Sequence, residues 1–156
     1  IFQPKGFPNF DLIFKNETAS KTHTLKHRFA WALLMWMISE GKVNSKSTVF
    51  DATSGNTGAS EAYMCKLVGL PFTAVVSHSN FFLHTVLLLS GKKSVLQVST
   101  NLEPEKLNQI TGHGGKIIKT DASLRIVRAQ EEAEKNNGFF TNQDGNAMHA
   151  EDVHES

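Results

Sequence analysis

The chain has 156 residues, of which 40% are hydrophobic and 20% are charged, and its formal net charge at neutral pH is +1. This composition is typical of a globular domain with its own core, and the balanced charge gives no basic surface for nucleic acid or a membrane. The single cysteine, Cys65, excludes an internal disulfide framework and favours a reducing compartment, so we expect a cytoplasmic protein.

Strand-like runs alternate with helical patterns along the chain. After an irregular lead-in over residues 1–20, the spacing of large apolar residues predicts a helix over 25–40, with Gly41 as its stop. The elements expected after it are strand 47–53, helix 59–68 stopped at Gly69, strand 71–76, helix 102–112, strand 116–120, helix 123–137 stopped at Gly138, and strand 139–142. The alternation predicts an α/β fold in three layers, with a mostly parallel sheet between helices on both faces.

A polar turn with two glycines, DATSGNTG over residues 51–58, joins a predicted strand to a predicted helix. Backbone N–H groups at a helix N-terminus favour an anion, and ligands of parallel sheets bind at the carboxyl ends of the strands. The turn therefore indicates an anion site, although a plain strand-to-helix connection has the same composition.

A lysine motif precedes this turn at a fixed distance. Thr24-Leu25-Lys26-His27-Arg28 contains Lys26, which stands 27 positions before Thr53. The two motifs together resemble the fold type II pyridoxal-phosphate enzymes of the tryptophan synthase β-chain type, close to cysteine synthase and cystathionine β-synthase. The segment 139–156, with Asn142-Gln143, is also similar to that family. The family pattern has serine and aspartate where this chain has Thr24 and His27, which leaves the role of His27 open.

The resemblance implies a cofactor and a role for each matched residue. Lys26 would form the Schiff base with pyridoxal 5′-phosphate and then remove the substrate's α-proton. The resemblance assigns Asn56 to the cofactor's 3′-oxygen, and it assigns the substrate carboxylate to Thr53, Ser54, Thr57 and Gln143.

The activity implied is β-replacement on a serine-type amino acid, as in cysteine synthase. A serine/threonine dehydratase-like lyase is the runner-up in the same class, and a non-catalytic fragment or pseudoenzyme is the alternative from another class. The expected partners are a small amino-acid substrate and, for a full-length parent, a second copy in a homodimer. We expect no nucleic acid and no membrane partner.

The family's second glycine-rich loop, which holds the cofactor phosphate, and its group at the pyridine nitrogen both follow the Asn-Gln segment. We therefore expect residues 1–156 to be the N-terminal part of a catalytic domain, with weak or no cofactor retention. Removing residues 77–98 restores the family spacing, so we expect this apolar segment to be an insertion outside the family pattern, such as a translated intron. A real lid or an oligomer contact is the alternative.

The candidate residues also have ordinary structural interpretations. Lys26 alone is typical of a surface lysine on an amphipathic helix, and Lys21 is its rival as the cofactor lysine. The spacing to Thr53 favours Lys26. His23 and His27 are four residues apart, a spacing that can bind a metal ion, but no third ligand is evident and we expect no metal site.

Overall fold

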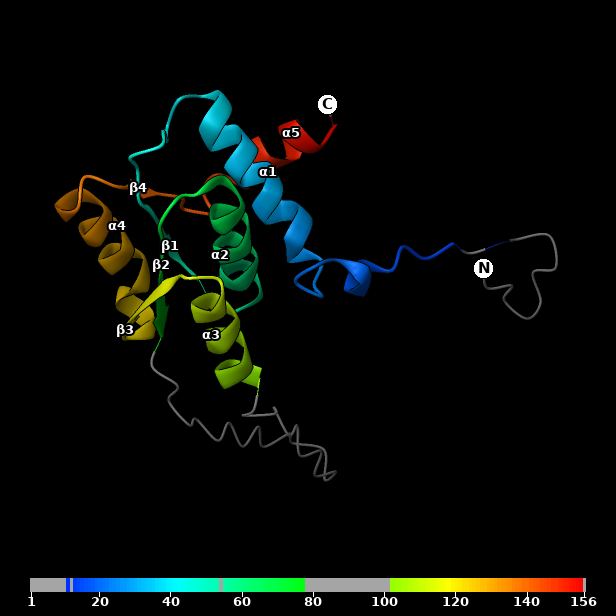
Figure 1. The fold of residues 1–156 in the computed structure, drawn as a ribbon, viewed down its shortest axis with the longest axis horizontal. Helices are drawn as coiled ribbons and strands as arrows, with labels where there is room; N and C mark the ends of the chain where they lie inside the picture. Colours follow the sequence, from blue (N-terminus) through cyan, green and yellow to red (C-terminus); the bar gives the residue numbers. More distant parts are fainter. Residues whose placement is uncertain (1–10, 12, 54, 78–101, 156) are drawn as a thin grey trace, which may run out of the picture.

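The structure is a computed structural model that describes residues 11, 13–53, 55–77 and 102–155. Within these residues four parallel strands form one sheet in the order β3-β2-β1-β4 (Figure 1). The strands are β1 (Val49–Ala52), β2 (Phe72–Ser77), β3 (Lys116–Thr120) and β4 (Phe139–Phe140). The predicted α/β fold with a parallel sheet is confirmed.

Helices cover both faces of this sheet. On one face α2 (Asn56–Val68) packs against β2, with α3 (Leu102–Gly112) on one side of it and α1 (Lys26–Ser39) on the other, where Trp36 contacts Phe139 of β4, and α5 (Ala147–Glu155) packs against α1 (Figure 1). On the other face α4 (Arg125–Lys135) packs against β1 and β2. Two short 3₁₀ turns, Glu17–Ala19 and Ala122–Leu124, precede α1 and α4. The three predicted layers are therefore present.

Alternation along the strands gives the sheet two apolar faces. Val49 and Ala74 lie in the larger core cluster with residues of α1 and α2. Ala52 and Val75 lie in a smaller cluster with Ala129 of α4. Side chains at odd positions of β1 therefore face α2, and this orientation also directs Asp51 and Thr53 toward α2.

Two helix bounds differ from the prediction. The helix expected over 59–68 begins at Asn56, because the chain reverses at Gly55 with φ 126° and enters α2 within the turn itself. The helix expected over 123–137 is a 3₁₀ turn followed by α4. Gly69 does end α2, with φ 75° and its N–H on the carbonyls of the last turn.

Gly138 has a different role from the predicted helix stop. The left-handed residue after α4 is Asn137, with φ 50°. A Cβ at Gly138 would lie 2.6 Å from the Thr48 carbonyl oxygen and 2.6 Å from the Phe50 ring, so a glycine is required there for packing against β1. The strand expected over 139–142 is also shorter, because Asn142, with φ 47°, turns the chain away from the sheet.

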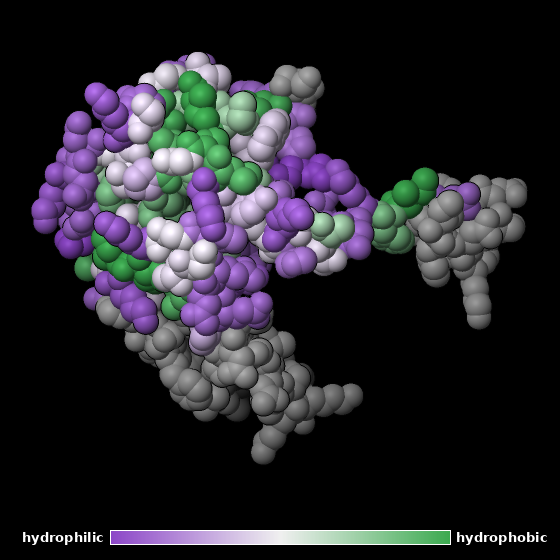
Figure 2. Space-filling model, in the orientation of Figure 1, coloured by the Kyte–Doolittle hydropathy of each residue, from purple (hydrophilic) through white to green (hydrophobic). Residues whose placement is uncertain are grey.

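Ser77, the first residue of the predicted insertion 77–98, is the last residue of β2 and pairs with Thr120. Residues 78–98 lie outside the described residues, so the insertion stays a prediction. Within the described residues no helix is long and apolar enough to cross a membrane. Apolar surface gathers over α1 (Figure 2), where the exposed large side chains include Trp31, Met35 and Ile38.

Candidate functional site

The turn after β1 is built around two glycines. Gly55 has φ 126°, a conformation that side chains rarely adopt, and Ala59 N–H donates to its carbonyl at 2.9 Å. A Cβ at Gly58 would collide with Thr53 Cγ2, so only glycine lets α2 approach the end of β1 this closely. The sequence therefore specifies a turn that brings the N-terminus of α2 directly onto Thr53.

The predicted carboxylate ligands of this turn differ in their surroundings. Thr53 is fully buried, and its Oγ1 has no hydrogen-bond partner among the described residues. Thr57 is also buried, whereas Asn56, the first residue of α2, is exposed. Ser54 lies outside the described residues. An unpaired buried hydroxyl costs free energy, so the Thr53 hydroxyl is a position where a polar ligand would be stabilising.

Gln143 reaches the same end of the sheet from the segment after β4. Its side-chain Nε2 donates to the Ala52 carbonyl at 3.1 Å, and its backbone N–H donates to Asp51 Oδ1 at 3.4 Å. These two bonds cross more than 90 residues of sequence. The structure therefore brings Gln143 to the carboxyl end of β1, beside the turn.

Lys26 is the first residue of α1 and is half-buried. Its backbone N–H donates to Thr24 Oγ1 at 3.3 Å, and the Thr24 N–H donates to Ser20 Oγ at 3.1 Å. Its Nζ lies 5.2 Å from the centre of the Phe29 ring, a cation–π contact. Within the described part of the chain no hydrogen bond joins the Lys26 ammonium to the turn.

The loop that leads into Lys26, residues 20–25 (the lysine loop), is nevertheless attached to α2. Thr22 Oγ1 lies 2.9 Å from Ser60 Oγ in a buried contact across 38 residues of sequence. Arg28 holds the preceding segment through Glu17, with 2.7 Å between Nη2 and Oε1. The structure therefore places the lysine loop and the glycine turn on adjoining first turns of α1 and α2.

Lys106 is a residue of this region that the sequence analysis missed. A Cβ at Gly55 would lie 3.5 Å from Lys106 Cγ, so the side chain of this α3 residue covers the turn. Its Nζ donates to Gln109 Oε1 at 3.3 Å. No spacing signal in the sequence connects residue 106 to the turn, because the contact depends on how α3 packs beside α2.

A buried carboxyl pair was also missed. Asp51 on β1 and Glu61 on α2 are 0% and 4% exposed, and Asp51 Oδ2 and both Glu61 oxygens have no donor of their own among the described residues. Burial raises the pKa of Asp51 to about 7, against the lowering effect of the Gln143 N–H. Burial, followed by the charge of Asp51, raises the pKa of Glu61 well above its usual range. The pair therefore retains a proton at neutral pH, with Glu61 as its carrier.

His23 in the lysine loop and His27 in the first turn of α1 contact different partners. His23 Nδ1 lies 2.9 Å from the Thr18 carbonyl oxygen, and His27 Nδ1 lies 3.1 Å from Thr22 Oγ1. In the part of the chain that the structure describes, no three His, Cys, Asp or Glu side chains gather around a position for a metal ion.

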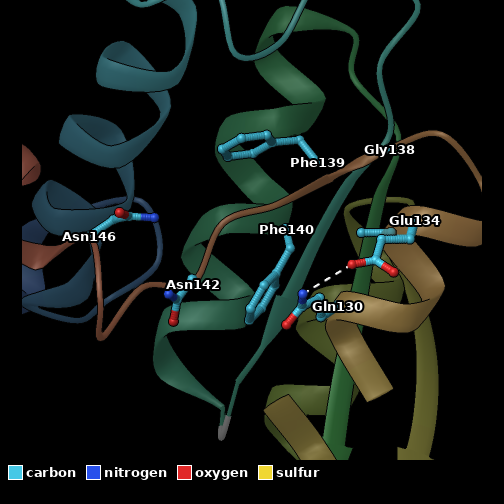
Figure 3. A pocket seen from close by; sticks show the side chains of 8 residues that line it. Gln130, Glu134, Gly138, Phe139, Phe140, Asn142 and Asn146 are labelled. Carbon is cyan, nitrogen blue, oxygen red and sulfur yellow. Dashed lines mark hydrogen bonds between the residues drawn. The ribbon is translucent and has the colours of Figure 1, made fainter. Parts of the chain in front are cut away.

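A surface hollow lies away from the turn, between α4 and β4. Gln130 and Glu134 form one wall, where Gln130 Nε2 donates to Glu134 Oε1 at 3.0 Å, and Phe140 points toward them (Figure 3). Asn142 and Asn146 lie on the opposite side. Among the described residues, none of those predicted for the site lines this hollow, and none of its lining residues has an amine for a covalent bond to an aldehyde.

Comparisons with known proteins indicate the same family as the sequence resemblance. Residues 4–155 match the family described as pyridoxal-phosphate dependent enzymes. The chain is similar to a putative pyridoxal-phosphate dependent protein of Caenorhabditis elegans, with 54% identity over 99% of this chain and 31% of that protein. It is also similar to L-cysteine desulfhydrase Cds1 of Mycobacterium tuberculosis, with 37% identity over 65% of this chain and 29% of that protein.

Solved structures share the fold. O-ureido-L-serine synthase matches with a TM-score of 0.62 and 24% identity over 81% of this chain and 34% of that one. The O-acetylserine dependent cystathionine β-synthase of Helicobacter pylori matches with a TM-score of 0.62 and 21% identity over 81% of this chain and 36% of that one. The chain spans about a third of the length of the relatives that it matches.

Proposed function

Because the chain belongs to the family of pyridoxal-phosphate dependent enzymes, we propose that it supplies the lysine and the carboxylate-binding turn for β-replacement on a serine-type amino acid. The observation that carries the proposal is the unpaired, buried Thr53 hydroxyl at the N-terminus of α2, beside the amide of Gln143. An amino-acid carboxylate is an anion that this donor set would bind.

The residues present are chemically suited to the cofactor. Lys26 offers a primary amine for the aldehyde of pyridoxal 5′-phosphate, and Asn56 offers an exposed amide at the start of α2. When bound, pyridoxal phosphate supplies an electron sink that stabilises negative charge at the substrate's α-carbon. In the proposal, Asn56 donates to the cofactor's 3′-oxygen, and the Lys26 amine accepts the substrate's α-proton.

The turn would orient the substrate through its carboxylate. In the proposal, the carboxylate binds to Thr53 Oγ1, which lies 3.1 Å from the Cβ position of Gly58, and to the first N–H groups of α2, where the helix dipole favours negative charge. The proposal also includes the hydroxyl of Thr57 and, from the family resemblance alone, that of Ser54, which lies outside the described residues. Gln143 Nε2 has two N–H groups and uses one on the Ala52 carbonyl, which leaves the other for a carboxylate oxygen.

A second candidate is the release of sulfide from L-cysteine, favoured by the 37% identity to the protein named an L-cysteine desulfhydrase. A serine/threonine dehydratase-like lyase is the third candidate, and a non-catalytic role is the fourth.

We also propose a small amino-acid substrate, a cytoplasmic location and, for a full-length parent, a homodimer. Light scattering on that parent tests the last of these.

The assay that separates these functions supplies saturating cofactor and follows three products. We expect L-cysteine from an O-acylated L-serine with sulfide, and loss of this product in Lys26→Ala but not in Lys21→Ala, which removes the rival lysine. Pyruvate from L-serine without cysteine synthesis would indicate the lyase, and sulfide from L-cysteine would indicate the desulfhydrase. No product from any substrate would contradict a catalytic role for this chain.

A further inference from the structure

The side chain that follows the candidate lysine begins a series of hydrogen bonds that ends on the glycine turn. His27 Nδ1 lies 3.1 Å from Thr22 Oγ1, Thr22 Oγ1 lies 2.9 Å from Ser60 Oγ, and Ser60 Oγ donates to the Asn56 carbonyl at 2.9 Å. Thr22 and Ser60 are 3% and 0% exposed. The series therefore connects the first turn of α1 to the first residue of α2 through hydroxyls shielded from water.

Counting protons gives this series one direction. A carbonyl oxygen only accepts, so the single hydroxyl proton of Ser60 is committed to Asn56. Ser60 Oγ must then accept from Thr22, which commits the single proton of Thr22. Thr22 Oγ1 must in turn accept from His27, so the Nδ1 of His27 carries a proton.

We propose that His27 is a positioning residue, whose Nδ1–H starts a directed hydrogen-bond series through Thr22 and Ser60 that fixes the Asn56 end of the turn against the lysine-bearing start of α1. The roles of Lys26 and Asn56 toward the cofactor rest on the proposed function, whereas the series itself does not. This assigns a role to the position where the chain departs from the aspartate of the family pattern.

The surroundings of the ring agree with this role. His27 is half-buried, and its ring centre lies 5.5 Å from that of Tyr63 on α2. Burial lowers the pKa of His27, so the neutral ring predominates at neutral pH. In the neutral ring only one nitrogen carries a proton, and the series places it on Nδ1. Protonation of the ring leaves Nδ1–H in place, so the series is the same in both charge states.

Long-range ¹⁵N–¹H NMR of the histidine rings tests the direction of the series. Wild-type His27 is expected in the Nδ1–H tautomer, and Thr22→Val, which removes the accepting hydroxyl, should return the ring to the Nε2–H tautomer. Thr111→Val is the matched control, because Thr111 is exposed and, among the described residues, its hydroxyl bonds to carbonyls of its own helix. An Nε2–H tautomer in the wild type, or an Nδ1–H tautomer that persists in Thr22→Val, overturns the proposal.

Hydrogen exchange of the Ala59 amide tests positioning, because this N–H closes the turn on the Gly55 carbonyl. His27→Asn places an amide N–H where Nδ1 stands and should keep the wild-type rate, whereas His27→Gln should raise the rate roughly five-fold, as expected for one lost hydrogen bond. The Leu70 amide, bonded to Cys65 at the far end of α2, is the internal reference. Equal Ala59 rates in wild type, His27→Asn and His27→Gln overturn the positioning role.

Cofactor capture is measured separately on the same variants. If the tautomer and the exchange rates behave as stated but wild-type Lys26 forms no covalent bond with pyridoxal 5′-phosphate, the proposed function fails and the positioning of Asn56 by His27 stands. If capture occurs and is equal in His27→Asn and His27→Gln, the proposed function stands and the effect of His27 on the lysine site is refuted.

Discussion

At the residue scale, the end of β1 concentrates buried polar atoms that have no basic partner among the residues that the structure describes. Asp51, Thr53 and Glu61 are almost fully buried. Asp51 Oδ2, Thr53 Oγ1 and both Glu61 carboxyl oxygens have no hydrogen-bond partner of their own among the described residues. A protonated Glu61 can donate to the Asp51 carboxylate, and Asp51 in turn accepts from Gln143 N–H. The carboxyl pair thus supports the segment that carries a proposed substrate ligand.

The pair makes stability depend on pH. The folded pKa values of Asp51 and Glu61 are raised above the ordinary 3.8 and 4.5, so the folded chain binds more protons than the unfolded chain above about pH 4. The stability that the retained protons contribute is fully present below the ordinary pKa values. It is lost as pH rises through the folded pKa, which is about 7 for Asp51. We expect the free energy of unfolding to fall over this window, by roughly 4 kcal/mol at most for Asp51.

Urea unfolding at a series of pH values measures this effect. Glu61→Gln keeps an amide donor for Asp51 and removes one titrating group, so the fall in stability between pH 5 and about 8 should become smaller. Glu131→Gln, at a side chain that is 60% exposed, is the control and should leave the fall unchanged. An identical pH dependence in wild type and Glu61→Gln would show that the pair does not retain its proton.

Several parts of the candidate site could be predicted from single motifs, and others could not. The glycine turn and its distance from Lys26 are local patterns, and Gln143, which only the family resemblance indicated, lies at the carboxyl end of β1 in the structure. The Asp51–Glu61 pair and the cover of Gly55 by Lys106 depend on packing between elements, which no spacing in the sequence records.

At the element scale, α2 depends on a close approach to β1. Gly58 lies at the contact, and a methyl group there would collide with Thr53 Cγ2. Strand and helix types were predictable because apolar periodicity is local. The start of α2 and the role of Gly138 were not, because they depend on Gly55 geometry and on the Phe50 ring, which is distant in sequence.

Alanine substitution at two helical glycines tests this contact. Gly58→Ala should destabilise the chain by about 1–3 kcal/mol, the usual cost of overpacking. Gly112→Ala is the matched control, because no atom of another described residue lies within 4 Å of a Cβ there, and it should be neutral or stabilising by up to about 1 kcal/mol. Denaturant midpoints of the two variants compare them directly, and equal stability would show that α2 does not need glycine at position 58.

At the scale of the whole molecule, the fold gathers three segments that are distant in sequence. The lysine loop bonds to α2 through Thr22 and Ser60, and the segment with Gln143 bonds to Ala52 at the end of β1, from which the glycine turn leads into α2. The parallel sheet accounts for the second contact, since β1 and β4 end at the same edge. We propose that this edge supports covalent capture of the cofactor at Lys26.

Reduction with borohydride followed by peptide mapping measures this capture, because it traps cofactor that is only weakly retained. With pyridoxal 5′-phosphate at less than one equivalent, we expect the reduced pyridoxyl group predominantly on Lys26, because the turn beside it offers donors that an exposed lysine lacks. Gly58→Ala, which disturbs the turn, should reduce this selectivity. A label spread over the exposed lysines, or concentrated on Lys21 or Lys106, would contradict the claim.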